Sequence, residues 1–217
     1  MNLPFTLEQF LGVFVSYNTT IWPAQIILNL LALIAIILTL RGRPPSRIIS
    51  VILASLWVWT GVVYHLLFFA VVNPAALLFG VLFIIQGMVF LIFGSLRSAI
   101  SFRFQSTPQG YAGAVFLAYG LLIYPVLGYF LGHLYPSSPT FGAPCPTTIF
   151  TFGLLLWTNR HVAFYIIVLP LLWSIIGFGA ALNLGILEDV GLLIAGLVGT
   201  VFLSVRTKSD SAQPRSQ

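Results

Sequence analysis

Long apolar runs separated by short polar breaks follow one another from residue 21 to residue 205. A helix needs about 20 apolar residues to cross the hydrocarbon core of a bilayer, and most of the runs reach that length. The pattern therefore predicts an all-α membrane protein, in which residues 1–205 form one transmembrane domain of seven helices surrounded by bilayer lipid. The expected spans are 21–40, 48–72, 74–96, 111–131, 140–157, 162–184 and 190–205.

The two ends of the chain fall outside these spans. Residues 6–19 are too short and too polar to cross a bilayer, but Thr6 and Gln9 match the pattern of a helix capping box. Because aromatic residues recur there at helical spacing, we predict a short helix that lies on the outer membrane interface. Residues 206–217 are polar, and we expect them to form a disordered cytoplasmic tail.

The composition excludes a soluble fold. Of all residues, 59% are hydrophobic and 6% are charged, with a mean hydropathy of +1.05, whereas soluble domains are about 25% charged. The first ten residues lack the basic start and the cleavage site of a signal peptide. No nucleic-acid-binding motif accompanies the formal charge of +5, so we interpret the excess of Lys and Arg as a record of membrane orientation.

With seven spans, every Lys and Arg falls on one side of the membrane, while Glu8, His133, Glu188 and Asp189 fall on the other. The positive-inside rule then places the N-terminus outside and the C-terminus in the cytoplasm. Omitting the span 140–157 would scatter the basic residues to both sides. We interpret the two acids between the last two spans as solvated turn residues. The alternative is that they form the entrance of a pathway and attract cations to it.

The span 140–157, TFGAPCPTTIFTFGLLLW, has an irregular start. Pro144 and Pro146 lack backbone donors and oppose a helix before them, whereas Thr147 and Thr148 are suited to capping a helix of about half a bilayer thickness. We predict a broken fifth helix whose N-terminus directs amide groups into a water-filled cavity, which favours an anion or carboxylate. The alternative is an outer loop followed by a short helix that is tilted or buried in protein.

An internal repeat is a further hypothesis. LASLWVWTG at 53–61 aligns with LPLLWSIIG at 169–177, and the same shift places the first span over the fifth. The implied plan is three helices, one linker helix and three more helices in the same orientation, as in transporters built from parallel repeats.

His65 is the leading candidate for a functional residue. It stands in the outer half of the second span, in WVWTGVVYHLLFF, without a charged residue nearby in the sequence. Polar groups within a membrane cost free energy and often mark function, so we consider a proton carrier, a ligand contact or a metal ligand. The alternative is a hydrogen bond between helices, which contributes only about 0.6–2 kcal/mol.

Other polar residues of the spans complete the predicted substrate site. Gln25 and Asn29 are four residues apart and share a helical face. For both residues, and for Gln86, the alternative is a structural role in which the side-chain amide forms hydrogen bonds between helices. The predicted substrate-binding residues are His65, Tyr64, Gln25, Asn29, Gln86, Cys145, Thr147 and Thr148.

Metal and cofactor chemistry has weaker support. Thiolate and imidazole ligands suit zinc or copper, but the candidates His65, His133 and Cys145 come from separate segments without paired spacing. No pair of histidines suited to haem stands at one depth, and no hydrolase motif or phosphate-binding loop is present. We therefore predict no cofactor.

Four segments together resemble a bacterial family of multi-pass membrane proteins known only as a domain of unknown function. They are IWPAQ at 21–25, VVYHLLFFAVVNPAA at 62–76, FRF at 102–104 and PTFGAPCPTTIFTFGLLLW at 139–157. The resemblance covers about residues 3–205. It implies an integral protein of the bacterial inner membrane, and some members of the family are loosely labelled permeases.

The leading functional prediction is a permease or transporter of a small molecule or ion, with a site in the outer half of the bundle near His65, Gln25 and residues 142–151. One alternative is a membrane-embedded redox protein that uses a metal, haem or quinone. Another is a non-catalytic subunit of a membrane complex. A homo-oligomer is compatible with each of these.

Overall fold

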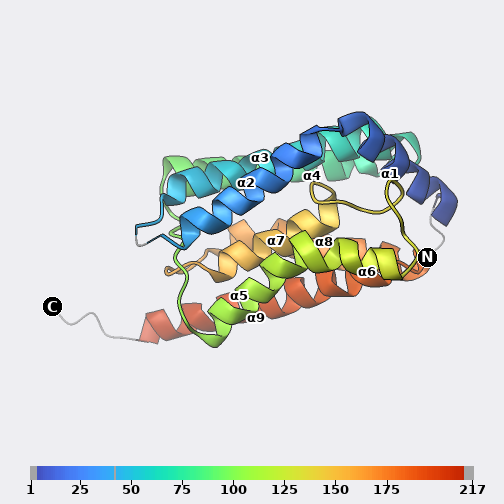
Figure 1. The fold of residues 1–217 in the computed structure, drawn as a ribbon. Coiled ribbons are helices and arrows are strands. Elements are labelled where there is room, and N and C mark those ends of the chain that lie inside the picture. The colour runs from blue at the N-terminus through green and yellow to red at the C-terminus, as the bar shows by residue number, and fades with distance from the viewer. Residues whose placement is uncertain (1–3, 42, 213–217) are drawn as a thin grey trace.

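The structure is a computed structural model that describes residues 4–41 and 43–212, with side chains as far as residue 205. Its described elements are helical (Figure 1). In chain order they are α1 (Leu7–Ile21), α2 (Ala24–Thr39), α3 (Ser46–Trp59), η1 (Thr60–Phe68), η2 (Phe69–Val71), α4 (Ala76–Val89), η3 (Phe90–Leu96), α5 (Pro108–Ala118), η4 (Tyr119–Ile123), α6 (Tyr124–Phe130), α7 (Pro144–Leu156), α8 (Phe164–Leu184), η5 (Leu187–Asp189) and α9 (Val190–Ala212).

Several of these elements join end to end into longer helices. Among the described residues, five helices are long and apolar enough to cross a membrane. They are Ser46–Val71, Ala76–Leu96, Pro108–Phe130, Phe164–Leu184 and Leu187–Val205. Their bounds follow the expected spans 48–72, 74–96, 111–131, 162–184 and 190–205 closely. The all-helical fold class is therefore confirmed, although the count of seven spans is not.

The first expected span, 21–40, is one arm of a bent pair. α1 and α2 meet at an angle of 88°, and they form a sixth candidate span only when the two are taken together. The bend is at Pro23, which lacks an amide hydrogen and opposes a helical conformation in the residue before it. At the start of α1 the predicted capping box is present, because Thr6 and Gln9 exchange side-chain and backbone hydrogen bonds.

The helices form two layers with α7 between them. α1, α2, α3 and α4 lie on one side in Figure 1, and α5, α6 and α9 lie on the other. α7 packs against α5 and α9 on one side and reaches α3 on the other, with α8 alongside. Nearly all side chains of α7 are buried as a result, and this helix is the centre of the apolar core.

α7 corrects the prediction for the span 140–157. The helix begins at Pro144 with Ala143 as its N-cap and without a side-chain cap, so Thr147 and Thr148 do not cap it. Proline fits the first turn of a helix because an amide hydrogen there has no acceptor within the helix. With 13 residues and a rise of about 1.5 Å each, α7 is too short to cross a bilayer alone. It is short and buried in protein, as the alternative interpretation states, while its first turn lines a cavity, as the broken-helix prediction states.

The loops between α2 and α3, between α4 and α5 and between α7 and α8 lie together at one end of the bundle. We call them the arginine loops, because they carry or directly border Arg41, Arg43, Arg47, Arg97, Arg103 and Arg160. Arg47 Nε donates to Ser98 Oγ at 2.8 Å, and Phe102 forms an isolated bridge with Thr158. These contacts bring together the α2–α3, α4–α5 and α7–α8 connections, at the left of Figure 1. The loops around residues 72–75, 131–143 and 185–189 lie at the opposite end. The membrane orientation derived from these charges stays a prediction.

α9 runs further than the expected seventh span. It continues to Ala212, so the expected start of a disordered tail at residue 206 is wrong by several residues. No glycine or proline interrupts the chain between residues 206 and 212, and Pro214 is the first residue that opposes a helix. Residues 213–217 lie outside the described part. The proposed internal repeat likewise stays a prediction, although α2 lies at the surface of the bundle and α7 at its centre.

Candidate functional site

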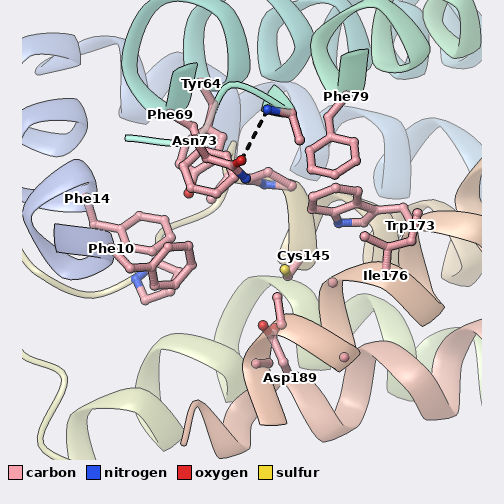
Figure 2. Close-up of a pocket in the computed structure, with 18 of the residues that line it drawn as sticks. Phe10, Phe14, Tyr64, Phe69, Asn73, Phe79, Cys145, Trp173, Ile176 and Asp189 are labelled. Atoms are coloured by element: carbon pink, nitrogen blue, oxygen red, sulfur yellow. Dashed lines mark hydrogen bonds between the residues drawn. The ribbon is translucent and has the colours of Figure 1, made fainter. Parts of the chain in front are cut away.

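A cavity of about 560 Å³ lies between the two layers, at the end of the bundle opposite the arginine loops. It is surrounded by α1, the end of the second span, α4, α6, α8 and η5, and the first turn of α7 also reaches it (Figure 2). Volumes of about 300–1,000 Å³ are typical of pockets for small molecules. The cavity is therefore large enough for a small organic ligand.

Aromatic side chains line the cavity on two sides. Figure 2 shows Phe10 and Phe14 of α1 facing the cavity from one side, with Phe79 and Trp173 on the other. The Phe79 and Trp173 rings meet edge to face, with centroids 5.3 Å apart. Aromatic pairs of this geometry hold each other in fixed positions, so the wall has a defined shape even without a ligand.

A few polar groups interrupt this apolar wall. Tyr64, Asn73, Cys145 and Asp189 all line the cavity (Figure 2). The Asn73 side-chain oxygen accepts a hydrogen bond from the Ala75 amide at 3.1 Å, which leaves the amide nitrogen of Asn73 for another partner. Two of the predicted substrate-binding residues, Tyr64 and Cys145, therefore do line a common cavity.

Asp189 is the most unusual of these groups. Its side chain is only 4% exposed, and one carboxylate oxygen accepts a hydrogen bond from Tyr124 Oη at 2.6 Å. Asp189 directly precedes α9, where aspartate often caps a helix, but its carboxylate is directed to Tyr124 and to neighbouring Cys145 instead. The expectation of a solvated turn acid is wrong for this residue.

The neighbouring acid is buried as well. Glu188 is fully buried, and its Oε1 atom lies 2.7 Å from Nδ1 of His133. Tyr119 Oη donates to the backbone oxygen of Glu188 at 2.8 Å. The acid therefore connects the loop after α6 to the start of α9 and holds the cavity end of the bundle together.

The N-terminus of α7 is a poor site for an anion, contrary to the prediction from the sequence. Pro144 and Pro146 have no amide hydrogen to donate, and the amide of Thr147 already donates to the Ala143 carbonyl at 3.3 Å. Of the first four residues of α7, Cys145 alone retains an amide hydrogen outside these constraints. Cys145 also lies beside the Asp189 carboxylate, so the chain supplies its own negative group here.

His65 lies behind the cavity wall and does not line the cavity. It is fully buried in η1, a wide π-helical stretch, and its ring packs edge-on against Trp173 with centroids 5.1 Å apart. Phe79 and Phe83 also pack against the ring. Neither ring nitrogen has a hydrogen-bond partner among the described residues, so the hydrogen bond between helices, which was the alternative interpretation of His65, is not formed.

We expect His65→Leu to raise the free energy of unfolding by about 1 kcal/mol. A buried donor and acceptor without partners cost about 1–3 kcal/mol, and leucine removes both while it fills similar space. His65→Asn is the matched control, because it keeps unpartnered polar atoms and should give no gain. Thermal unfolding of the three purified proteins in detergent measures the difference. A loss of stability in the leucine variant would show that His65 has a partner which this arrangement lacks.

Gln25 stabilises the bend between α1 and α2 rather than the cavity. Its Nε2 atom donates to Asn18 Oδ1 at 2.8 Å and to Thr140 Oγ1 at 3.0 Å. Asn18 in turn donates to the backbone oxygens of Pro136 and Ser138. This network ties the 131–143 loop to the bend, which matches the interpretation of Gln25 as structural.

The remaining predicted substrate residues also make structural contacts. Asn29 Nδ2 donates to the Gln25 backbone oxygen at 2.8 Å, and Gln86 Nε2 donates to the Ile166 backbone oxygen at 2.9 Å. Thr148 Oγ1 donates to the Pro144 carbonyl at 2.8 Å, while Thr147 Oγ1 has no partner among the described groups. None of these side chains lines the cavity.

The weak metal candidates are not brought together. His133 pairs with Glu188, His65 is enclosed by aromatic rings, and Cys145 lines the cavity. Within the described residues, no group of three or more His, Cys, Asp or Glu side chains is placed to hold a metal ion.

One family model covers nearly the whole chain. A family of unknown function, DUF6064, matches residues 7–213. The chain belongs to the DUF6064 family. This membership confirms the predicted relationship to a domain of unknown function. No curated protein and no solved structure matches this DUF6064 chain.

Sequence reasoning on the DUF6064 chain missed the importance of Asp189 and of its donor Tyr124. The signal available in the sequence was the pair Glu188-Asp189 itself, because acids are rare in this chain and two of the four stand together. Their position between two apolar helices suggested a solvent-exposed turn. Their burial depends on side chains from α6 and the following loop, which adjacency in the sequence does not indicate.

Proposed function

We propose that this protein is a permease that takes up a small, largely apolar solute through the cavity between its two helix layers. The observation that carries the proposal is the cavity itself, with about 560 Å³ enclosed by aromatic walls and a few polar groups. Ligand pockets commonly have this composition, in which apolar side chains supply affinity and a few polar groups fix orientation.

The position of α7 supports a route that is open at one end. The first turn of α7 lines the cavity, and the rest of the helix fills the space between the layers as far as Leu156 with buried side chains. Irregular backbone such as residues 139–143 is tolerated at membrane depth where protein or a cavity covers it. A site that is accessible from one end and sealed at the other is what an alternating-access mechanism requires in one of its states.

The proposal includes the predicted placement in a bacterial inner membrane with the N-terminus outside. In that orientation the arginine loops are cytoplasmic and the cavity lies in the outer half of the bundle. The solute then enters from the outer face. Transport to the other side requires the helices around α7 to separate at the arginine end.

Uptake into proteoliposomes tests the proposal with Ala180→Trp, which fills the cavity from α8. The labelled probes are phenylalanine and benzyltrimethylammonium, which both carry an apolar ring, cross lipid slowly and differ in net charge. We expect wild-type protein to accelerate uptake of at least one probe over protein-free liposomes, and Ala180→Trp to abolish the acceleration.

Leu182→Trp is the matched control, because Leu182 is on the same helix but is 59% exposed and outside the cavity. It should keep wild-type uptake. Uptake at the protein-free rate for both probes, or equal uptake by the two tryptophan variants, would contradict a permease that works through this cavity.

A further inference from the structure

We infer that the solute carries a protonated amine, which binds the Asp189 carboxylate at the floor of the cavity while an aromatic or branched apolar body lies against the rings above it. The inference rests on the proposed solute site and adds the chemical class of its ligand. Its basis is the combination of a buried acid, an aromatic wall and the absence of a basic partner among the described side chains.

The Asp189 carboxylate is accessible from the cavity and is incompletely bonded. One oxygen accepts the Tyr124 hydroxyl at 2.6 Å, and no other hydrogen bond to this carboxylate forms among the described oxygen and nitrogen groups. The Cys145 thiol is its other polar neighbour, and a thiol is only a weak donor. The residue is 4% exposed but lines the cavity, so a ligand in the cavity can reach its free acceptor sites.

No positively charged side chain in the described part of the chain pairs with Asp189. The ion pair found there joins His133 to Glu188, and no arginine is among the described residues that line the cavity. A carboxylate removed from water is costly unless a cation and hydrogen bonds compensate it. A bound ammonium group supplies both the charge and the N–H donors that the protein does not provide.

The wall above the carboxylate suits the rest of such a ligand. Phe14, Phe69, Phe79 and Trp173 line the cavity around the polar groups (Figure 2). Ring faces attract cations, and burial of apolar area adds affinity. Asn73 and Tyr64 stand on the side of the second span, where they can hydrogen-bond a further polar group of the ligand.

A carboxylate ligand fits this site poorly. It would lie close to Asp189, and the first turn of α7 offers few amide donors because Pro144 and Pro146 have none. A neutral hydroxyl could donate one hydrogen bond to Asp189 but would leave its charge uncompensated. The geometry therefore selects an amine over an alcohol, and an alcohol over an acid, when the apolar body is the same.

Ligand-observed fluorine NMR with matched probes tests this order. The probes are 4-fluorobenzylamine, 4-fluorobenzyl alcohol and 4-fluorobenzoate, each titrated against wild-type protein in detergent at neutral pH. We expect the amine to bind at least about tenfold tighter than the alcohol, since a hydrogen bond between charged groups contributes about 1.5–3 kcal/mol. Ala180→Trp should remove the binding of both, which separates the cavity from partition into micelles.

Asp189→Asn tests the assignment of the carboxylate. We expect it to lower amine affinity to that of the alcohol and to leave alcohol affinity within about twofold. Asp189→Glu, which keeps the charge, should retain a preference for the amine. Should the asparagine variant fail to fold, the amine-to-alcohol ratio in wild type and in Asp189→Glu still decides the question.

Two patterns of failure are distinguishable. Equal binding of amine and alcohol by wild type, or tighter binding of the benzoate, overturns the inference about the amine and leaves the cavity and its proposed uptake function standing. Selective amine binding that depends on Asp189, without uptake of any probe into proteoliposomes, supports the ligand class and overturns the permease.

Discussion

Gly120→Val is expected to lower the free energy of unfolding by about 3 kcal/mol, the upper part of the range for overpacking. Gly120 lies in η4, where the third long helix passes α7. A Cβ atom at this position would lie 2.8 Å from the Pro146 carbonyl oxygen and 3.3 Å from the Phe150 amide nitrogen. Both are backbone atoms of α7, so the clash cannot be relieved by a side-chain rotation.

The same close approach recurs along the interface between α5 and α7. A Cβ atom on Gly113 would lie 2.8 Å from the Gly153 carbonyl oxygen, and one on Gly153 would lie 2.7 Å from Leu117 Cγ. Small residues that let helix backbones approach closely are typical of helix packing in membranes. Displacing α7 at Gly120 therefore disturbs the whole interface.

Gly12→Val is the control for Gly120→Val. Gly12 is also helical, and nothing lies within 4 Å of a Cβ built there, so the intrinsic cost of valine in a helix is present at both sites but the clash at only one. Size-exclusion chromatography and detergent unfolding of both variants measure the difference. Equal stability of the two would show that η4 and α7 are not in close contact.

His133→Ala is expected to cost about 3 kcal/mol, because removal of one partner leaves the other as a buried, unpaired charge. Glu188 is fully buried, its Oε1 atom contacts His133 at 2.7 Å, and its Oε2 atom has no partner among the described residues. Without the imidazole, the Glu188 carboxylate has no side-chain partner among the described residues. The loop after α6 would then separate from the start of α9.

The double variant His133→Ala/Glu188→Gln separates this charge effect from lost packing. Glutamine is neutral and similar in shape, so the double variant should be more stable than His133→Ala alone, and a double-mutant cycle gives the coupling between the two residues. Unfolding in detergent, followed by circular dichroism, provides the four free energies. A coupling close to zero would mean that the two side chains do not interact in solution.

Apolar composition was enough to predict five long helices, because a run of about 20 apolar residues has few alternatives to a buried or lipid-facing helix. The capping box of Thr6 and Gln9 could be predicted for a similar reason, since its partners are three residues apart. The start of α7 could not be predicted in this way. Thr147 and Thr148 had the side chains of helix caps, but two prolines that tolerate a first turn moved the start to Pro144.

The candidate site was harder to predict than the helices, because it depends on contacts between distant segments. Tyr124 and Asp189 are 65 residues apart, and His133 and Glu188 are 55 apart. A pattern of residue types along the chain does not indicate that residues so far apart in the sequence are in contact. Polar residues such as Gln25 drew attention because they interrupt apolar helices, yet their partners are backbone atoms and loop residues that hold the fold together.

The enclosed position of α7 has a consequence for how the protein is made. A helix of 13 residues is too short to enter a bilayer as an independent span, and its neighbours α8 and α9 follow it along the chain. When α7 leaves the ribosome, α8 and α9, which cover part of its surface, have not yet been synthesised. The packing of α7 is therefore complete only after α9 has been added, and the cavity at its first turn needs α8 and Asp189 as well.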